Sequence, residues 1–170
     1  MFETSRKINV LFLCTGNSCR SQMAEGWARH LLSDECVAYS AGIEAHGLNP
    51  MAVRVMSEAG VDITTQLSQT IDQLPVIAWD MVITVCDNAR EACPYMPGVE
   101  LTVHHSFDDP PFLAKGLTEE DALKVYRRVR DDIKEFVSAL PQYFKPLREQ
   151  RAASSEQRVA SSEQRVANSE

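Results

Sequence analysis

The sequence predicts an α/β fold in which a central four-stranded parallel sheet carries helices on both faces. Short β-rich apolar stretches alternate along the chain with stretches whose apolar residues recur at spacings of three and four, which is the pattern of βαβ units. Residues 7–13 are nearly continuously apolar, as expected for a strand buried on both faces. Because crossovers between parallel strands are right-handed, the expected architecture is a three-layer sandwich.

Each element has its own signal in the sequence. Strands are expected where apolar, β-rich residues cluster, at residues 7–13, 36–40, 79–85 and 101–107. Helical spacing, with Pro and Gly near the expected ends, predicts helices at residues 21–33 and 50–60 and one short helix within residues 61–75. The last helix of the domain begins after Thr118, where Asp121 completes a pattern similar to a capping box, and it ends before Pro141.

The C-terminal tail differs in composition from the rest of the chain. The heptapeptide of residues 153–159 recurs as residues 160–166, and its only apolar residues, Val and Ala, are adjacent. A coiled-coil seam requires two spaced apolar positions sustained over several heptads, so we expect a frayed helix or a disordered tail. The sequence therefore predicts one folded domain at residues 1–147 and a flexible repeat tail at residues 148–170.

Net charge and cysteine content exclude several classes of protein. Seventeen basic and 24 acidic residues give a formal net charge of −7, which argues against a general nucleic-acid binder but leaves room for a small anion site. No apolar run is long enough to span a membrane or to form a secretory leader, so we expect a cytoplasmic protein. In a reducing compartment the five cysteines are expected to be thiols rather than structural disulfides.

The strongest chemical signal is the octapeptide CTGNSCRS at residues 14–21, between the first strand and the first helix. At such a junction the loop amides can point at a common centre, and the helix N-terminus adds partial positive charge. Arg20 offers a planar fork for two oxygens of a tetrahedral anion. The same positive field favours the thiolate of Cys14, which would be a nucleophile aimed at the central atom of a bound oxyanion.

The other loop residues are expected to shape the anion site. Gly16 permits the tight backbone path, and Asn17 and Ser18 are expected to brace the loop by side-chain hydrogen bonds. Cys19 and Cys36 are expected to be structural thiols. The expected anion ligands, chiefly through loop amides, are Thr15, Gly16, Asn17, Ser18, Cys19 and Arg20.

Two further thiols and an acid complete the candidate residues. Cys86 follows the third expected strand, and the carboxyl ends of parallel strands share one edge, so Cys14 and Cys86 can be neighbours. Six residues separate Cys86 from Cys93, which is not the spacing of a zinc or thioredoxin motif. The intervening segment could switch conformation and bring the two sulfurs together, or Cys93 is simply a small buried residue. A proton donor for a leaving oxygen is expected at Asp108 or Asp109, although an Asp-Pro step also suits a plain turn.

These motifs resemble a known family. The spacing of Cys14 and Arg20 resembles the CX5R loop of low-molecular-weight protein tyrosine phosphatases. Residues 14–27, CTGNSCRSQMAEGW, are more similar to the thioredoxin-coupled arsenate reductases that share that fold. The resemblance covers roughly residues 7–140 and implies a low-molecular-weight phosphatase-like fold.

The resemblance implies reduction of arsenate to arsenite by a relay of three thiols. In the resembling reductases, the residue matching Cys14 attacks arsenate, and a Cys14–Cys86 disulfide forms as arsenite leaves. The residue matching Cys93 then resolves this bond, and a Cys86–Cys93 disulfide remains for reduced thioredoxin. The resemblance favours Asp109 over Asp108 as general acid. It also implies thioredoxin as partner, no tightly bound cofactor, and phosphate or sulfate as competing anions; we expect a monomer.

The resemblance also raises the question of a metal ion. Some of the resembling reductases hold potassium near the loop through residues matching Asn17, Glu25, Ser40 and an Asp. Gln69 stands at the last of these positions, so the site loses one charge, and we expect no metal there. Nor do the histidines suggest a metal site, because the adjacent His104 and His105 would face opposite sides of a strand.

Two other functions are consistent with the same residues. A low-molecular-weight protein tyrosine phosphatase would use the loop and its acid alone, but residues 110–113, Pro-Pro-Phe-Leu, lack the paired tyrosines of the resembling phosphatases. A non-enzymatic thiol redox sensor would instead expose Cys86 and Cys93 on oxidation and so recruit a partner.

Overall fold

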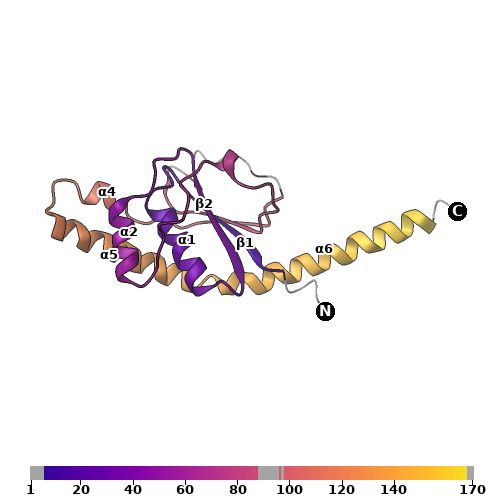
Figure 1. Cartoon of the computed structure of the whole chain (residues 1–170). Helices are drawn as coiled ribbons and strands as arrows, with labels where there is room; N and C mark the ends of the chain where they lie inside the picture. Colours follow the sequence, from indigo (N-terminus) through magenta and orange to yellow (C-terminus); the bar gives the residue numbers. More distant parts are fainter. Residues whose placement is uncertain (1–5, 88–95, 97, 168–170) are drawn as a thin grey trace.

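A parallel sheet lies at the centre of the computed structural model, which describes residues 6–87, 96 and 98–167. Helices pack against the sheet, and one long helix extends beyond it (Figure 1). In spatial order the four strands are β2 (Cys36–Gly42), β1 (Ile8–Cys14), β3 (Met81–Thr84) and β4 (Leu101–His104). Every neighbouring pair is parallel, which confirms the predicted class, a three-layer α/β sandwich around a four-stranded sheet.

The strands differ from their predicted ranges at their ends. β2 reaches Gly42 because it remains paired with β1 as far as Cys14. β3 and β4 are shorter than predicted. After β4 the chain still follows the edge of β3, since the N–H groups of His105 and Phe107 donate to the carbonyls of Thr84 and Val85, at 3.0 and 3.1 Å.

The helices begin and end within a few residues of the predicted positions, and the short helix expected within residues 61–75 is a single 3₁₀ turn, η2. The four-residue helix α4 was not predicted, because it is too short to show helical spacing. The bounds are α1 (Arg20–Leu31), α2 (Pro50–Glu58), η2 (Ile71–Gln73), α4 (Pro110–Leu113), α5 (Glu119–Ser138) and α6 (Pro141–Ala167).

The core forms where α1 lies against β1 and β2 and packs on α5. β1 has strands on both sides, and its residues from Val10 to Cys14 are buried, as their apolar sequence predicts. Trp27 of α1 is also buried, and its indole N–H donates to the carbonyl of Arg130 on α5 at 3.1 Å. Removal of this apolar surface from water is the main favourable contribution to folding.

Side-chain caps fix where two helices begin. The Asn49 side chain accepts from the N–H groups of Met51 and Ala52, and Pro50 occupies the first turn of α2, where no N–H is required. Thr118 accepts from the N–H of Asp121 at 3.2 Å, so the cap predicted for α5 is confirmed.

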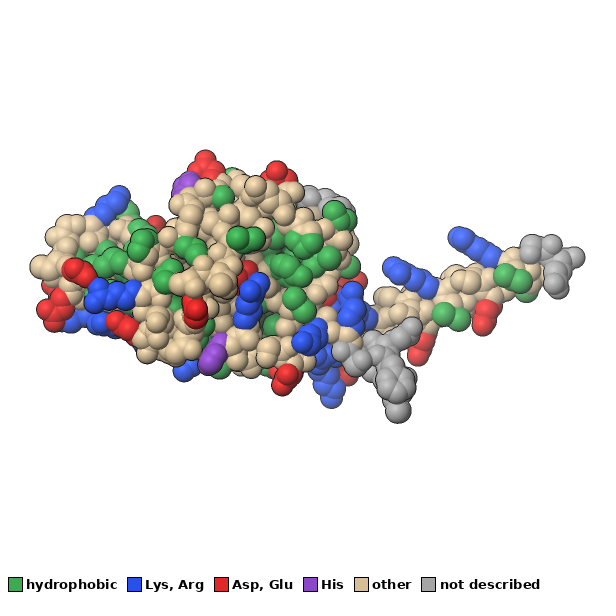
Figure 2. Space-filling view, viewed as in Figure 1, with side chains coloured by type: hydrophobic (Ala, Val, Ile, Leu, Met, Phe, Trp, Pro, Cys, Tyr) green, Lys and Arg blue, Asp and Glu red, His purple; other side chains and the backbone are tan. Residues whose placement is uncertain are grey.

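The helix α6 runs along the body and then projects from it (Figure 1). Its buried residues, Phe144 and Leu147, lie near its start, and the projecting part shows separate acidic and basic side chains on its surface (Figure 2). The repeats therefore form a helix through residue 167, whereas the sequence left a frayed helix and a disordered tail as alternatives. The domain boundary predicted at residue 148 falls within this helix. No helix in the described ranges is both long and apolar enough to cross a membrane.

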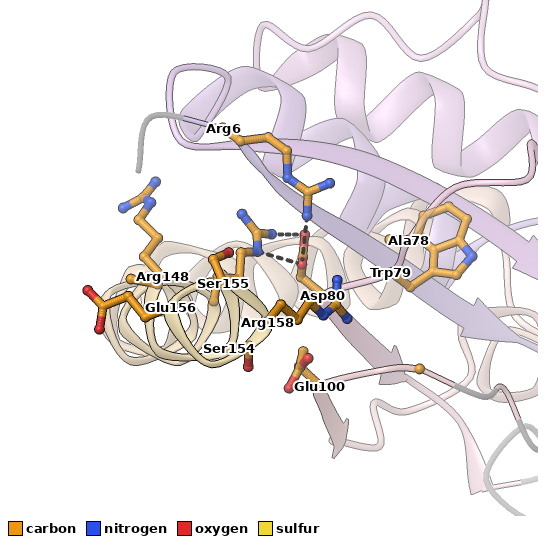
Figure 3. A pocket seen from close by; sticks show the side chains of 13 residues that line it. Arg6, Ala78, Trp79, Asp80, Glu100, Arg148, Ser154, Ser155, Glu156 and Arg158 are labelled. Carbon is orange, nitrogen blue, oxygen red and sulfur yellow. Dashed lines mark hydrogen bonds and ion pairs between the residues drawn. The ribbon is translucent and has the colours of Figure 1, made fainter. Parts of the chain in front are cut away.

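A buried carboxylate fastens α6 to the sheet. Asp80 precedes β3, and its side chain is only 4% exposed. It accepts from the N–H of Asn9 at 2.7 Å. It also accepts from Arg6 at 3.2 Å and from Nε of Arg151 at 2.9 Å (Figure 3). Nη2 of Arg151 also forms an ion pair with Oδ2 of Asp80. A buried carboxylate requires such partners, because an unpaired charge is costly to desolvate.

The first prediction concerns this attachment. Arg151→Ala should lower the free energy of unfolding by about 1–3 kcal/mol, because Asp80 stays buried with fewer donors. Urea denaturation followed by circular dichroism measures the change. Arg158 lines the same pocket as Asp80 and Arg151 but forms no ion pair with any described residue (Figure 3). Arg158→Ala should therefore change the free energy of unfolding by less than about 0.5 kcal/mol. Equal effects of the two substitutions would contradict the assignment.

Candidate active site

The loop of residues 14–21 leaves β1 at its carboxyl end and enters α1, and a second segment, residues 43–49, lies beside it. N–H groups of that segment donate to four loop carbonyls: Ile43 to Cys14 at 3.3 Å, Glu44 to Thr15 at 2.9 Å, His46 to Gly16 at 2.9 Å and Asn49 to Ser18 at 3.0 Å. The C=O and N–H of a trans peptide point in opposite directions, so the N–H groups of these peptides face away from residues 43–49. The loop can therefore present several amide donors to one anion.

The left-handed residue of the loop is Asn17 and not Gly16. Asn17 has φ of 46°, a conformation that Asn tolerates better than most residues. Gly16 is needed for space instead, because a Cβ there would lie 2.5 Å from Nδ1 of His46. The bracing predicted for Ser18 is provided by its carbonyl, which accepts from Asn49, rather than by its hydroxyl.

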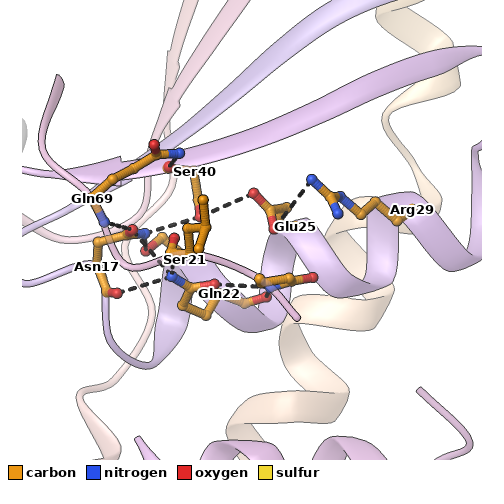
Figure 4. A network of polar contacts seen from close by, with 9 residues as sticks. Asn17, Ser21, Gln22, Glu25, Arg29, Ser40 and Gln69 are labelled. Atoms are coloured by element: carbon orange, nitrogen blue, oxygen red, sulfur yellow. Dashed lines mark hydrogen bonds and ion pairs between the residues drawn. The ribbon is translucent and has the colours of Figure 1, made fainter. Parts of the chain in front are cut away.

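The Asn17 side chain is fully buried and holds the loop in place (Figure 4). Its Nδ2 donates to the hydroxyls of Ser21 and Ser40, both at 2.9 Å. Its Oδ1 accepts from the N–H of Gln69 at 2.8 Å and from Nε2 of Gln22 at 3.1 Å. All the hydrogen-bonding capacity of this amide is used, so the side chain connects the loop to α1, β2 and the segment before η2.

The Cys14 sulfur lies at the base of the loop, beside a hydroxyl donor. Sγ of Cys14 is 2.8 Å from Oγ of Ser21, and the thiol is 4% exposed. Because Nδ2 of Asn17 donates to the same Ser21 oxygen, the Ser21 hydroxyl can direct its hydrogen at the sulfur. A donor in this position stabilises negative charge on sulfur, the form that attacks. Sequence reasoning missed this role of Ser21, which becomes visible only when the loop is closed.

Arg20 and Asp109 lie side by side at the mouth of the loop. Nη1 of Arg20 donates to the carbonyl of Phe107 at 3.0 Å, and Nη2 lies 3.8 Å from Oδ1 of Asp109. Asp108 is directed elsewhere and accepts from Arg128 on α5 at 3.0 Å. Asp109, which is 45% exposed, is thus the carboxyl group placed near the loop.

The second thiol lies next to the loop. Cys86 follows β3, is 2% exposed, and its Sγ lies 3.3 Å from Oγ1 of Thr15. Thr15 is the residue directly after Cys14, so the carboxyl ends of β1 and β3 bring the two thiols to one region of the molecule. Cys93 lies outside the described residues.

The other two described thiols are buried and are not placed for chemistry. Burial raises the pKa of the Cys19 thiol far above its ordinary value, although Arg20 opposes the shift. Burial also raises the pKa of Cys36, to about 11. A thiol that stays protonated is a poor nucleophile, which agrees with the structural role predicted for both.

Behind Asn17 lies a buried acid. The side chain of Glu25 is 3% exposed, with Oε1 accepting from the hydroxyl of Ser40 at 3.3 Å and Oε2 lying 3.7 Å from Arg29 (Figure 4). Oε2 has no hydrogen-bond partner. Burial raises the pKa of Glu25 to about 7, although Arg29 and Ser40 act in the opposite direction.

This arrangement does not fit a bound potassium ion. A cation of this kind needs several oxygens free to coordinate it, but both acceptor sites of Asn17 Oδ1 are already occupied by N–H donors. The Gln69 amide directs its Nε2 at the Ser40 carbonyl, at 3.2 Å. Among the side chains of Asn17, Glu25, Ser40 and Gln69, Oε2 of Glu25 is buried without a hydrogen-bond partner, and it already lies 3.7 Å from Arg29. No group of three or more acidic, His or Cys side chains in the described ranges could hold a metal.

The chain is similar to known phosphatases and arsenate reductases. Residues 9–153 match the family model of low molecular weight phosphotyrosine protein phosphatase. An arsenate reductase of Halalkalibacterium halodurans is 55% identical over 124 residues, 73% of this chain and 88% of the relative. An arsenate reductase of Bacillus subtilis is 53% identical over 124 residues, with the same coverage of 73% and 88%.

Solved structures agree with these matches. An arsenate reductase in a phosphate-binding state superposes with a TM-score of 0.66 at 33% identity, covering 81% of this chain and 98% of that one. A low molecular weight protein tyrosine phosphatase from T. tengcongensis gives a TM-score of 0.63 at 23% identity, over 81% of this chain and 99% of that one, and so shares the fold.

The second prediction concerns Glu25. The folded state raises the pKa of this carboxyl from about 4.5 to about 7, so between these pH values the folded chain binds more protons than the unfolded chain. The contribution of Glu25 to stability should therefore fall as pH rises through this window. Between pH 4.5 and pH 8, the free energy of unfolding of Glu25→Gln should rise by on the order of 3 kcal/mol relative to that of the wild type. Urea denaturation at each pH measures this difference.

A matched control is the exposed Glu135 on α5, where Glu135→Gln should leave the pH dependence of unfolding unchanged. If Glu25→Gln and the wild type follow parallel curves of stability against pH, the carboxyl of Glu25 is not the buried group described above.

Proposed function

The chain belongs to the low molecular weight phosphotyrosine protein phosphatase family, and from this premise we propose that it is a thioredoxin-coupled arsenate reductase. The observation that carries the proposal is the second thiol at the oxyanion loop, with Cys86 Sγ 3.3 Å from Thr15 Oγ1. Phosphate-ester hydrolysis needs a single thiol, whereas reduction needs a second one to accept the bond from the first. The arsenate reductases at 53–55% identity support the same substrate.

In the first step, the Cys14 thiolate attacks the arsenic of arsenate. The loop amides and the Arg20 guanidinium hold the oxyanion, and the hydroxyl of Ser21, 2.8 Å from the sulfur, stabilises the thiolate before attack. An oxygen leaves arsenic as water, with the proton supplied by Asp109. The product of this step is a covalent adduct between Cys14 and arsenic(V).

In the second step, the Cys86 thiolate attacks the sulfur of Cys14. A sulfur–sulfur bond forms, the sulfur–arsenic bond breaks, and its electron pair stays on arsenic, which leaves as arsenite. Two thiols are thereby oxidised and arsenic(V) is reduced by two electrons. Cys93 would then attack Cys86, release the Cys14 thiolate and leave a Cys86–Cys93 disulfide, which two electrons from thioredoxin reduce.

Protein tyrosine phosphatase activity is the alternative, because arsenate and phosphate share shape and charge. The same loop, Arg20 and Asp109 would serve it, and we expect a weak phosphatase activity beside the reductase activity. A thiol redox sensor is the second alternative, and multiple turnover of arsenate would exclude it as the whole function.

The third prediction tests the relay. With arsenate, thioredoxin and thioredoxin reductase, the wild type should consume NADPH over many turnovers. Cys86→Ser and Cys93→Ser should each lower this rate by about 100-fold or more, because no disulfide can be passed onward. Cys36→Ala, which removes a thiol at the start of β2, should retain most of the rate. Wild-type rates in both relay variants would show that the relay is wrong.

The fourth prediction tests the acid with a matched pair. Asp109→Asn should lower hydrolysis of p-nitrophenyl phosphate by about 100-fold, within the range for loss of a general acid. Asp108→Asn removes a neighbouring carboxyl that pairs with Arg128 and should change this rate less than about threefold. Steady-state kinetics across pH measures both variants. The reverse ranking of the two would transfer the role of acid to Asp108.

A further inference from the structure

A chain of hydrogen bonds lies beside Cys86 and is not used in the steps above. Thr84 and His104 are register partners at the ends of β3 and β4, and Oγ1 of Thr84 lies 2.7 Å from Nδ1 of His104. The other ring nitrogen, Nε2, lies 3.1 Å from Oδ1 of Asp87. Asp87 is the residue directly after Cys86, so this chain ends next to the second thiol.

The ring of His104 is held at both nitrogens. Thr84 is 3% exposed and fixed within the sheet, so it defines the position of Nδ1. In the neutral tautomer that satisfies both contacts, the Thr84 hydroxyl donates to Nδ1 and the Nε2–H donates to Asp87. The adjacent His105 follows the end of β4 and has a different partner, because its ring stacks on Phe136 at a centroid distance of 4.4 Å.

Cys86 is thus anchored on both sides along the chain. Before it, the N–H of Val85 donates to the carbonyl of Leu13 on β1 at 2.9 Å. After it, Asp87 has a 75% exposed side chain, and its side-chain contact within the described part of the chain is the one to His104. The backbone at Cys86 therefore depends on His104 for its second anchor.

We propose that His104 is a positioning residue that, through Asp87, holds Cys86 against the loop for its attack on Cys14. The inference rests on the proposed function, because only the reductase requires Cys86. Thiol attack on sulfur requires an aligned approach, and a small displacement of a reacting group costs a large part of its rate. Among the described residues, the side chain of His104 hydrogen-bonds to Thr84 and Asp87 and not to the anion loop or to Arg20.

The test separates the step of Cys86 from the step of Cys14. Pre-reduced enzyme is mixed with excess arsenate in the absence of thioredoxin, and arsenite release is followed over a single turnover. His104→Ala should slow this release about tenfold, and His104→Gln, which keeps a hydrogen-bonding group, should recover part of it. Asp87→Ala should have a similar effect, and the double variant should be no slower than either single variant.

Hydrolysis of p-nitrophenyl phosphate uses Cys14 without Cys86 and should stay within about twofold of the wild type in all these variants, with an unchanged KM. His30→Ala, at the exposed end of α1, is the control for replacement of a histidine. Equal losses in arsenite release and phosphatase rate would indicate a general structural role and would overturn the proposal. A wild-type single-turnover rate in His104→Ala would overturn it as well.

A second measurement keeps this inference separate from the reductase itself. Alkylation of Cys86 by iodoacetamide, followed by peptide mass spectrometry, should be several-fold faster in His104→Ala, because the buried Cys86 thiol becomes accessible. Alkylation of Cys14 should be unchanged. Unchanged alkylation of Cys86 would refute the anchoring. Failure of the wild type to form any arsenite would instead refute the proposed function, whatever the alkylation rates.

Discussion

The parallel pairing of β1 with β3 is the constraint on which the site depends. Parallel strands end at the same edge of a sheet, so the residues that follow them meet there although they lie far apart in sequence. This pairing brings Cys86 to within hydrogen-bond distance of the loop that begins at Cys14. Extension of the same edge by β4 places His104 beside Thr84, and the chain that follows carries Asp109 to Arg20.

The loop itself is held by buried polar contacts rather than by apolar packing. Asn17 adopts a left-handed conformation, and its side-chain amide hydrogen-bonds to three parts of the chain. This arrangement buries several polar groups, each of which needs a hydrogen-bond partner. Most are paired within the network, but Oε2 of Glu25 is not. Burial raises the pKa of Glu25 to about 7, because desolvation disfavours the charged carboxylate more than the contacts with Arg29 and Ser40 favour it.

Periodicity and helix end signals predicted the order of the four strands and of α1, α2 and α5, since those signals are local, but they missed the short helix α4. The same is true of the motif residues Cys14 and Arg20, whose positions at a strand–helix junction are visible in sequence. The contacts of Ser21 and His104 were not predicted. Those of Ser21 depend on the closed conformation of the loop, and those of His104 depend on the pairing of β3 with β4. Conformational freedom was assigned to Gly16 on residue type alone, whereas the structure requires Gly16 for space and places the left-handed conformation at Asn17.

The position of Cys86 also bears on why one fold can serve two reactions. An adduct on Cys14 has two electrophilic centres, the central atom of the oxyanion and the Cys14 sulfur. Water attacks the first and completes hydrolysis; a thiolate attacks the second only if the central atom can keep the electron pair, which arsenic does on passing from As(V) to As(III). With phosphate, Cys86 would therefore be a spectator. In the proposed mechanism, the outcome with arsenate depends on how closely Cys86 is held to Cys14, and the segment that carries Cys86 contacts Thr15 and, through Asp87, His104.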